Sequence, residues 1–389
     1  MNVPKLRFKE FNDEWNLTNI RNISSLVTKG TTPKKYEDNG INFVKVENIH
    51  DNLISNISSY ISGDTHNKEL KRSILKENDI LFSIAGALGR TAIVKKSILP
   101  ANTNQANAII RIENLDNIDL YYLLNRLNHT DITNYINKCQ SVGAQPNLSL
   151  EQVNNINISL PSINEQNKIG NMLFLLDKKI ELQSKKIEDL KLFKKGLNKI
   201  IYSDCCFIAK IKDIIEEYNE RTQKNNQYKI LSSTSTGIFF QDEYFNKQAA
   251  SSNNIGYKIV PRGYITYRSM SDTGEFHFNI QNIIDNGIVS PAYPVFNIKN
   301  NIVDKNFLVD YLNENRNFKN KILSAKEGGT RYALSLSKLK ELNISLPDYD
   351  QQVRYSKVLN ICNLKIKLEN NYLENLIKFK KILMKNMFV

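Results

Sequence analysis

The chain has few residues of the kinds that build disulfides and metal sites. Its 389 residues include four cysteines and four histidines, and the cysteines lack the paired spacing of a zinc site. No apolar run approaches the roughly 20 residues of a membrane helix. The first residues lack the apolar centre of a signal peptide. We therefore expect incidental or structural thiols, no metal site, no membrane partner and a cytoplasmic location.

Two motifs of catalysis are also missing. The sequence contains neither the Gly-x-x-x-x-Gly-Lys-Ser/Thr segment of ATP-binding loops nor the Asp/Asn-Pro-Pro-Tyr/Phe segment of amino-methyltransferases. Residues 86–91, Gly-Ala-Leu-Gly-Arg-Thr, have the wrong glycine spacing and an arginine in place of the lysine, which favours a tight turn over an ATP site. The carboxylate-and-lysine pattern of nucleases is too loose to decide by inspection.

Two stretches of the chain repeat each other. Residues 147–203 and 333–389 align without a gap at an offset of 186, with 20 identities in 57 positions. Both contain Asn-Ile-Ser-Leu-Pro, at Asn157–Pro161 and Asn343–Pro347. The remaining stretches, 1–146 and 204–332, share almost no identity. A frame that repeats while its inserts diverge indicates one scaffold with two readers of different targets.

Each repeat has apolar residues on alternating three- and four-residue steps. They are Leu173, Leu176, Ile180, Ile187, Leu190, Leu197 and Ile201 in the first copy, and Leu359, Cys362, Ile366, Leu373, Leu376, Leu383 and Met387 in the second. This spacing predicts two coiled-coil helices of about 40 residues. Pro161 and Pro347 mark the boundary before each helix. Since the second helix must lead back towards the first domain, we expect the pair to be antiparallel.

The other parts of the chain alternate short β-like runs with helical stretches, which predicts a mixed α/β (α+β) fold. Strands are expected at 41–46, 79–84, 108–112, 257–260, 264–267 and 294–298, and helices at 119–128 and 306–316.

The net charge of +13 indicates a polyanionic partner. Residues 164–203 hold nine lysines against five carboxylates, and residues 348–389 hold eight basic against four acidic residues. These two short stretches therefore carry +8 of the +13. A solvated lysine-rich helix surface explains the same excess, and charge alone leaves both readings open.

Short motifs in a fixed order complete the pattern. The first half has Gly30-Thr-Thr-Pro, Val44-Lys-Val-Glu-Asn-Ile, Asn78-Asp-Ile-Leu-Phe-Ser-Ile-Ala-Gly, Gly89-Arg-Thr-Ala-Ile-Val and Asn104-Gln; the second has Gly263-Tyr-Ile-Thr-Tyr-Arg-Ser, Gly287-Ile-Val-Ser-Pro and Gly328-Gly-Thr-Arg-Tyr-Ala-Leu-Ser. Within the duplicated frame, this order resembles the DNA-specificity subunit of a type I restriction–modification system over essentially the whole chain.

The resemblance implies a division into four parts and a role without catalysis. Residues 1–163 and 204–347 correspond to two target-recognition domains, and 164–203 and 348–389 to two coiled-coil spacer helices. Each domain is expected to read one half of a split, asymmetric double-stranded DNA target. The helices are expected to hold the domains apart and to dock two adenine-N6 methyltransferase subunits, joined by restriction subunits that translocate DNA. S-adenosylmethionine, ATP and Mg are then expected on the partner subunits and not on this chain.

Polar and basic residues in or beside these motifs are the candidates for DNA contact, since Gly allows close backbone approach, Lys and Arg suit phosphates, and Asn, Gln and Arg suit base edges. They are Lys29, Thr31, Thr32, Lys34, Lys35, Arg90, Asn104 and Gln105 in the first half, and Arg268, Ser269, Ser271, Lys326, Thr330 and Arg331 in the second. Gln145 and Arg331 occupy equivalent places just before the repeat, so one loop presents Gln, which prefers adenine, and the other Arg, which prefers guanine. The alternative is that these loops contact no DNA and instead brace the start of each long helix.

Two other classes of protein fit part of the pattern. A coiled-coil architectural DNA-binding protein without methyltransferase partners predicts dimerisation through the helices and weak sequence preference. A fused nuclease or methyltransferase with divergent motifs predicts turnover by the isolated chain.

Overall fold

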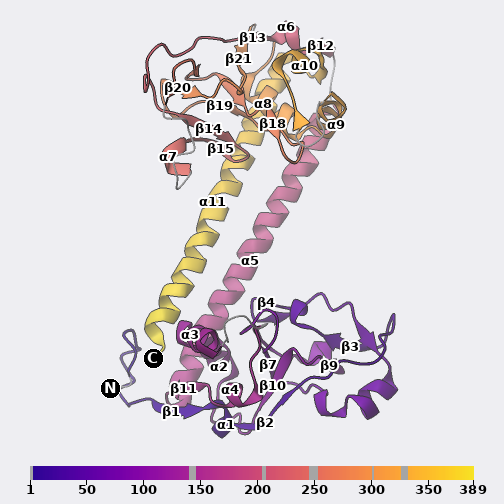
Figure 1. Cartoon of the computed structure of the whole chain (residues 1–389), viewed down its shortest axis with the longest axis vertical. Coiled ribbons are helices and arrows are strands. Elements are labelled where there is room, and N and C mark those ends of the chain that lie inside the picture. The colour runs from indigo at the N-terminus through magenta and orange to yellow at the C-terminus, as the bar shows by residue number, and fades with distance from the viewer. Residues whose placement is uncertain (1–2, 140–145, 204–206, 245–252, 300–301, 326–331) are drawn as a thin grey trace. The chain divides into compact units, whose positions relative to one another are not determined.

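The computed structural model describes residues 3–139, 146–203, 207–244, 253–299, 302–325 and 332–389 (Figure 1). The chain forms two compact units. The first unit joins Met1–Ser184 to Asn371–Val389, and the second is Lys185–Asn370. The division falls inside the two longest helices, so each unit contains a globular domain and one stretch of each long helix.

A four-stranded antiparallel sheet organises the first unit, in the order β2-β10-β7-β8. Its strands are β2 (Ser24–Lys29), β10 (Asn107–Ile112), β7 (Ile80–Ser83) and β8 (Thr91–Ile93). Successive strand residues point to opposite faces. Ile80 and Phe82 accordingly pack with helices α2 (Leu120–Leu127) and α3 (Thr130–Cys139), whereas Leu81 packs with Val44 on the other side.

Shorter elements complete the first unit. They are β1 (Asn16–Asn19), α1 (Ile20–Ile23), β3 (Ile41–Val44), η1 (Val46–Asn48), β4 (Ile49–His50), β5 (Leu53–Ile54), β6 (Tyr60–Ile61), η2 (Thr65–Glu69), η3 (Lys71–Ser73), η4 (Lys96–Ile98), β9 (Ala101–Thr103), α4 (Leu150–Asn154) and β11 (Asn157–Leu160). Strands β6, β3 and β9 form a three-stranded sheet, and β1 pairs with β11. The β11 strand is the repeated Asn-Ile-Ser-Leu segment, so the repeat enters the domain as a strand before it becomes a helix.

The second unit contains a sheet with the same connectivity, β13-β21-β17-β19. Its strands are β13 (Ile215–Glu217), β21 (Val295–Ile298), β17 (Ile265–Tyr267) and β19 (Phe278–Ile280). If the four strands of each sheet are numbered along the chain, both sheets have the spatial order 1-4-2-3. Strand β12 (Phe207–Lys210) pairs with β23 (Asn343–Leu346) as β1 pairs with β11. The two domains therefore share a core fold although their sequences diverge.

The remaining elements of the second unit surround this sheet. They are α6 (Ile211–Ile214), β14 (Leu231–Thr234), β15 (Gly237–Phe240), α7 (Gln241–Tyr244), β16 (Lys258–Pro261), β18 (Met270–Ser271), β20 (Asn286–Val289), α8 (Lys305–Glu314), α9 (Arg316–Ala325), β22 (Tyr332–Ala333) and α10 (Leu336–Glu341). Its core contains β17, β19 and β21 side chains together with apolar residues of α8 and α9.

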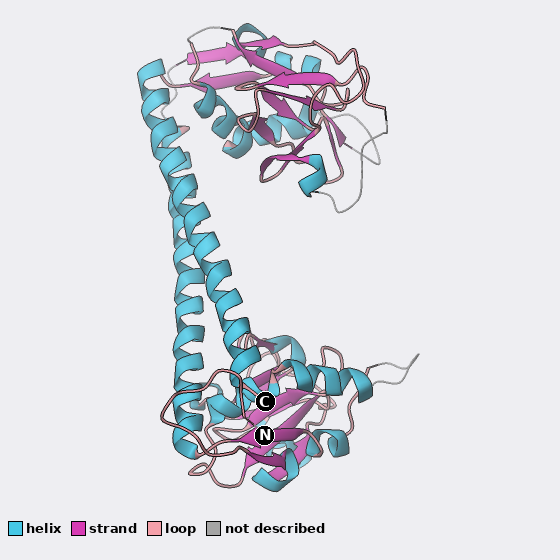
Figure 2. Cartoon of the chain, turned by 90° about the vertical axis from the view of Figure 1, so that its left-hand side faces the viewer, coloured by secondary structure: helices cyan, strands magenta, loops and turns pink. Residues whose placement is uncertain are grey.

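The two long helices, α5 (Ile163–Ile201) and α11 (Tyr349–Met387), have 39 residues each (Figure 2). Each begins two residues after the proline of its repeat. Ser162 accepts the backbone N–H of Glu165 at 3.4 Å, and Asp348 accepts that of Gln351 at 2.9 Å. Such side chains satisfy N–H groups that have no partner within the helix. The predicted helices and their start points are confirmed.

The helices run antiparallel in each unit. In the first unit, Leu173 shares a cluster with Leu383, and Lys380 donates to Asp177 at 2.5 Å. In the second unit, Lys186 pairs with Glu369 at 2.8 Å, and residues near the end of α5 pack with residues near the start of α11. Every predicted heptad position is buried or half-buried.

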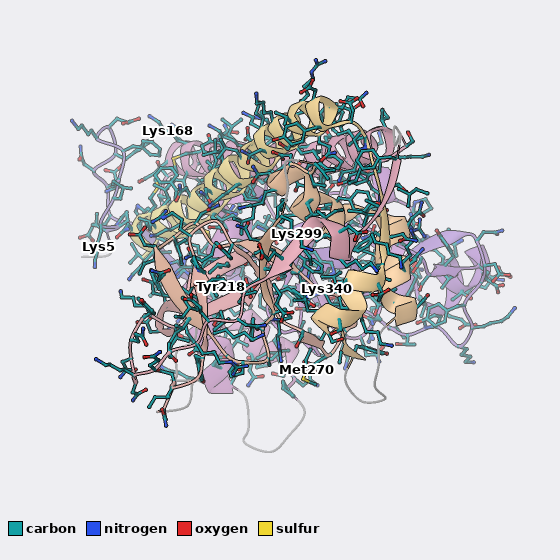
Figure 3. All side chains as sticks on the ribbon, turned by 90° about the horizontal axis from the view of Figure 1, so that it is seen from above. Lys5, Lys168, Tyr218, Met270, Lys299 and Lys340 are labelled. Carbon is teal, nitrogen blue, oxygen red and sulfur yellow. The ribbon has the colours of Figure 1, made fainter. Side chains whose placement is uncertain are left out.

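The N-terminal segment packs on the start of α5 in the first unit. Lys168 lies 4.5 Å from the ring centre of Phe8 and forms an ion pair with Glu10; Lys168 and Lys5 are labelled in Figure 3. Backbone N–H of Leu6 donates to the carbonyl of Asn386 at 2.8 Å. Segments close to both chain ends therefore meet on this unit.

Two predicted elements needed correction. The strand expected at 41–46 ends at Val44, because the side chain of Asn48 accepts the N–H of Lys45 at 2.8 Å and turns the chain into η1. The helix expected at 306–316 ends at Glu314, because the side chain of Asn315 accepts the N–H of Phe318 at 3.0 Å and starts α9. The other predicted strands and the helix at 119–128 are present with end shifts of one residue. The four-part domain division stays a prediction.

Candidate nucleic-acid interface

A loop after β2 is held tightly against the turn between β9 and β10. The N–H of Gly30 donates to the carbonyl of Asn107 at 3.1 Å, and that of Thr31 to the carbonyl of Thr103 at 3.0 Å. A Cβ atom on Gly30 would lie 2.1 Å from the carbonyl oxygen of Asn104. Only glycine permits this approach, so the Gly30-Thr-Thr-Pro motif is needed for the loop to reach the turn.

This contact brings together five of the predicted residues, namely Lys29, Thr31, Thr32, Asn104 and Gln105. The Thr32 hydroxyl hydrogen-bonds to the side-chain carbonyl of Gln105. The guanidinium of Arg72, on η3, donates to the hydroxyl of Thr31 at 3.2 Å. Arg72 is exposed and was not among the predicted residues, because it lies in none of the motifs. The result is a polar, basic cluster at one end of β2 and β10.

Two lysines extend this cluster along the loop. Lys34 is exposed, and Lys35, with 79% of its side chain exposed, lies 3.3 Å from Glu37. An exposed pair of this kind is easily exchanged for a phosphate, because it contributes little energy in water. A cavity of about 690 Å³ borders the cluster, with Lys29, Gln105, Ile84 and Asn147 in its wall.

Arg90 lies away from this cluster and has other partners. Its guanidinium donates to the carbonyls of Val46 and Ile49, at 3.3 and 3.2 Å. These bonds connect the turn after β7 to η1 and β4. The contact of Arg90 with DNA stays a prediction. The side chain also has a structural role, because it holds these two segments together.

In the second unit, three predicted residues follow the end of β17. Arg268 is exposed. The Ser269 hydroxyl donates to the carbonyl of Ala292 at 2.5 Å, and the Ser271 oxygen accepts the N–H of Gly274 at 3.0 Å. The serines therefore shape the chain, and Arg268 is left as the side chain suited to an anion. Met270, labelled in Figure 3, is 39% exposed beside them.

The residues that follow the two loops predicted to present Gln145 and Arg331 are arranged alike. The N–H of Leu148 donates to the carbonyl of Ile84 at 2.8 Å, and that of Leu334 to the carbonyl of Ser269 at 2.9 Å. Gln145, Lys326, Thr330 and Arg331 lie outside the described residues. Leu148 and Leu334 therefore lie beside the chain just after β7 and just after β17. In the first unit this end of β7 also borders the cavity lined by Lys29 and Gln105.

A second surface feature was missed in the sequence. Exposed apolar side chains occur on both long helices at positions related by the offset of 186. They are Leu175 and Ile361, Leu182 and Leu368, and Phe193 and Phe379, all more than half exposed. They fall seven and eleven residues apart on each helix, outside the buried heptad positions. Leu175 and Leu182 belong to the first unit, and the equivalent Ile361 and Leu368 to the second. Each unit therefore presents the same short apolar stripe to solvent, which we call the repeated apolar stripe.

Other kinds of site find no support in the described part of the chain. There, no group of three His, Cys, Asp or Glu residues is arranged to hold a metal ion. None of its helices is long and apolar enough to cross a membrane. Cys139 and Cys362, the two cysteines described, are both free thiols.

Comparison with known proteins identifies the family. Residues 12–192 and 208–378 match the Type I restriction modification DNA specificity domain, one copy in each half. The chain therefore belongs to this family of DNA-recognition proteins, the specificity subunits of type I restriction–modification systems. It is a non-catalytic DNA-binding chain, as the resemblance implied.

Three relatives carry names of this kind. One, of Methanocaldococcus jannaschii, is named for the specificity subunit of the type I restriction enzyme MjaX; it is 27% identical over 242 residues, 58% of this chain and 56% of the relative. The EcoBI specificity subunit of Escherichia coli is 30% identical over 167 residues, 40% and 34% of the two chains. The chain thus spans about half and a third of these two relatives. The MjaVIII specificity subunit of M. jannaschii is 23% identical over 411 residues, 96% and 91% of the two chains.

Solved structures support the fold. The S subunit of a type I restriction–modification system from M. genitalium aligns with a TM-score of 0.64 at 15% identity, covering 100% of this chain and 99% of that one. A chain from a structure of type I system assembly and conformational transition aligns with a TM-score of 0.56 at 14% identity, covering 96% and 97%. The mixed α/β fold is therefore confirmed.

Proposed function

We propose that this chain gives a type I restriction–modification complex its DNA sequence specificity by reading a two-part, asymmetric target, one half with each domain. The observation that best supports this proposal is the shared sheet connectivity of the two domains, combined with different side chains at matching strand ends. Two copies of one fold with different contact residues suit two half-sites of different sequence.

We propose that the side chains divide the work by chemistry. Lys29, Lys34, Lys35 and Arg268 suit phosphates, and Asn104 and Gln105 suit base edges. Because Gly30 fixes Gln105 against the loop of Thr31 and Thr32, its amide has a defined direction. Gln145 and Arg331 are proposed as base readers, Lys326 and Thr330 as their neighbours, and Ser269, Ser271 and Arg90 as residues that hold contact loops in place.

Matched variants test this division. Gln105→Ala should weaken binding to the specific duplex by ~1–3 kcal/mol and leave binding to random DNA unchanged. Lys34→Ala should weaken both and lower the slope of log affinity against log salt by roughly 1, whereas Lys34→Arg, which keeps the charge, should not. Equal losses on specific and random DNA for Gln105→Ala would show that it reads no base.

We propose that the repeated apolar stripe docks two methyltransferase subunits, one on the stripe of each unit. Large exposed apolar surfaces mark interaction sites, and a stripe that repeats at an offset of 186 suits two copies of one partner. Restriction subunits would join this assembly. S-adenosylmethionine, ATP and Mg would then bind those partners, and the complex would act in the cytoplasm.

Leu182 and Leu368 provide a matched test of docking, since they are equivalent leucines with 60% and 55% exposure. Native mass spectrometry of the chain co-expressed with its methyltransferase should show one chain with two methyltransferases. Leu182→Glu or Leu368→Glu should each remove one copy, and the double variant both. Glu181→Ala, a change at an exposed polar neighbour, is the control. Two bound copies on the double variant would contradict docking here.

A further inference from the structure

Two glutamines occupy the same place in the two units and make the same contacts. Gln166 and Gln352 are equivalent in the repeat, at the start of α5 and of α11, with 2% and 0% exposure. Their neighbours differ: Glu165 corresponds to Gln351 and Asn167 to Val353. General similarity of this turn therefore does not account for the shared side chain.

In the first unit, Gln166 uses both ends of its amide. Its Nε2 donates to the carbonyl of Pro161 at 2.9 Å and to that of Asn117 at 3.2 Å. Its Oε1 accepts the N–H of Asp119 at 3.1 Å. Asp119 in turn caps α2 by accepting the N–H of Tyr122 at 2.6 Å.

In the second unit, Gln352 repeats this set. Its Nε2 donates to the carbonyls of Pro347 and Ile302 at 2.8 and 3.3 Å, and its Oε1 accepts the N–H of Asp304 at 3.0 Å. Asp304 caps α8 by accepting the N–H of Phe307 at 2.9 Å. Each glutamine therefore connects the turn before a long helix to the first turn of the helix that packs on the domain's sheet.

The opposite long helix supplies a second anchor to each domain helix. Phe388, next to the end of α11, lies 5.3 Å from the ring of Tyr122 on α2. Its equivalent Tyr202, next to the end of α5, lies 5.3 Å from the ring of Tyr311 on α8. A domain helix held at two points on two long helices has little freedom to rotate relative to them.

We infer that Gln166 and Gln352 are positioning residues, which set the orientation of each reading domain on its long helix without touching DNA. The amide is suited to this because it donates and accepts at once, and its bond to the carbonyl of Pro161 or Pro347 is buried, where an unpaired group is costly. Methionine fills a similar volume but leaves the N–H of Asp119 or Asp304 and two carbonyls unpaired. This inference rests on the proposed reading of two half-sites.

The test uses the complete complex with its methyltransferase and duplexes altered in one half-site or in the gap. Gln166→Met should reduce discrimination at the first half-site by roughly tenfold, comparable to one lost base contact, and should raise binding to targets whose gap differs by one base pair. Discrimination at the second half-site and the salt dependence should not change. Gln352→Met should give the mirror result, so each variant is the other's control.

A purely structural role predicts a different outcome, namely weaker binding overall with the gap preference intact. That result, or full discrimination in both folded variants, would overturn the inference. If a methionine variant does not fold, Gln166→Asn, which keeps an uncharged amide and withdraws it by one CH₂ group, is measured in the same way with the same expectation. Absence of any two-part target for the unchanged chain would instead contradict the proposed function.

Discussion

The guanidinium of Arg7 donates two hydrogen bonds of 2.8 Å to the carboxylate of Glu165, a side chain with no exposed surface. Glu165 lies in the first turn of α5, so this pair attaches the N-terminal segment to the long helix. The hydrogen bonds to Glu165, helped by the attraction of its charge, raise the pKa of Arg7 against the lowering effect of burial. A buried carboxylate is stable only while its charge is paired.

Arg7→Ala should therefore destabilise the first unit by about 3–5 kcal/mol, because it leaves the charge of Glu165 buried and unpaired. The measurement is urea-dependent hydrogen exchange of β10 and α2. Arg21→Ala is the control, since Arg21 and Glu151 form a pair with 54% and 66% side-chain exposure and should contribute less than about 1 kcal/mol. Similar losses for both variants would contradict this account of Arg7.

Gly30→Ala tests how the first candidate contact cluster is built. The added Cβ would lie 2.2 Å from the carbonyl oxygen of Thr103 and closer still to that of Asn104, so the loop must move away from the turn. Binding should lose discrimination at the first half-site and keep it at the second. Gly63→Ala, where a Cβ meets nothing within 4 Å, should bind as the unchanged chain does. Unaltered half-site discrimination in Gly30→Ala would mean that the cluster does not read DNA.

Asp310, on α8, makes the second unit sensitive to pH. Burial raises the pKa of Asp310 to about 6, against the attraction of Lys194 and with the help of repulsion from Glu314. Because the folded-state pKa lies above the ordinary value, the stability of this unit falls as pH rises from about 4 through 6. Six residues after the equivalent cap, the first unit has Asn125 instead.

Asp310→Asn should therefore stabilise the second unit at pH 7–8, by up to about 3 kcal/mol at 1.36 kcal/mol per pKa unit. The advantage should shrink towards pH 4. Hydrogen exchange of α8 across this pH range measures it, with Asp285→Asn, whose side chain is 90% exposed, as the control. A stabilisation that does not vary with pH would contradict this role for Asp310.

Local patterns were enough to predict the long helices. The heptad spacing from Leu173 to Ile201, together with Pro161, fixed the extent of α5 and its buried face. The shared sheet was not predictable, because strand pairs such as β2 with β10 join residues some 80 positions apart with no common sequence signal. Leu182 was equally hidden: a leucine outside the heptad positions looks the same in sequence whether or not a partner covers it.

The candidate interface was predictable only in part. Sequence motifs marked Thr31, after Gly30, and Gln105, in Asn104-Gln, and the fold brings them together. The same reasoning marked Arg90, whose carbonyl partners lie more than 40 residues earlier in the chain and give no local signal. Arg72 was missed for the complementary reason, because only the tertiary fold places it beside Thr31.

The modified DNA itself tests the central claim most directly. Modification-sensitive sequencing of cells that carry this chain and its methyltransferase should reveal one asymmetric motif, made of two short half-sites and a fixed unread gap. Gln105→Ala should relax bases in one half-site only, and Arg331→Ala, a change at a proposed base reader of the second domain, should relax bases only in the other. A continuous motif, or variants that each alter both half-sites, would contradict the account that two similarly folded domains read two separate sequences.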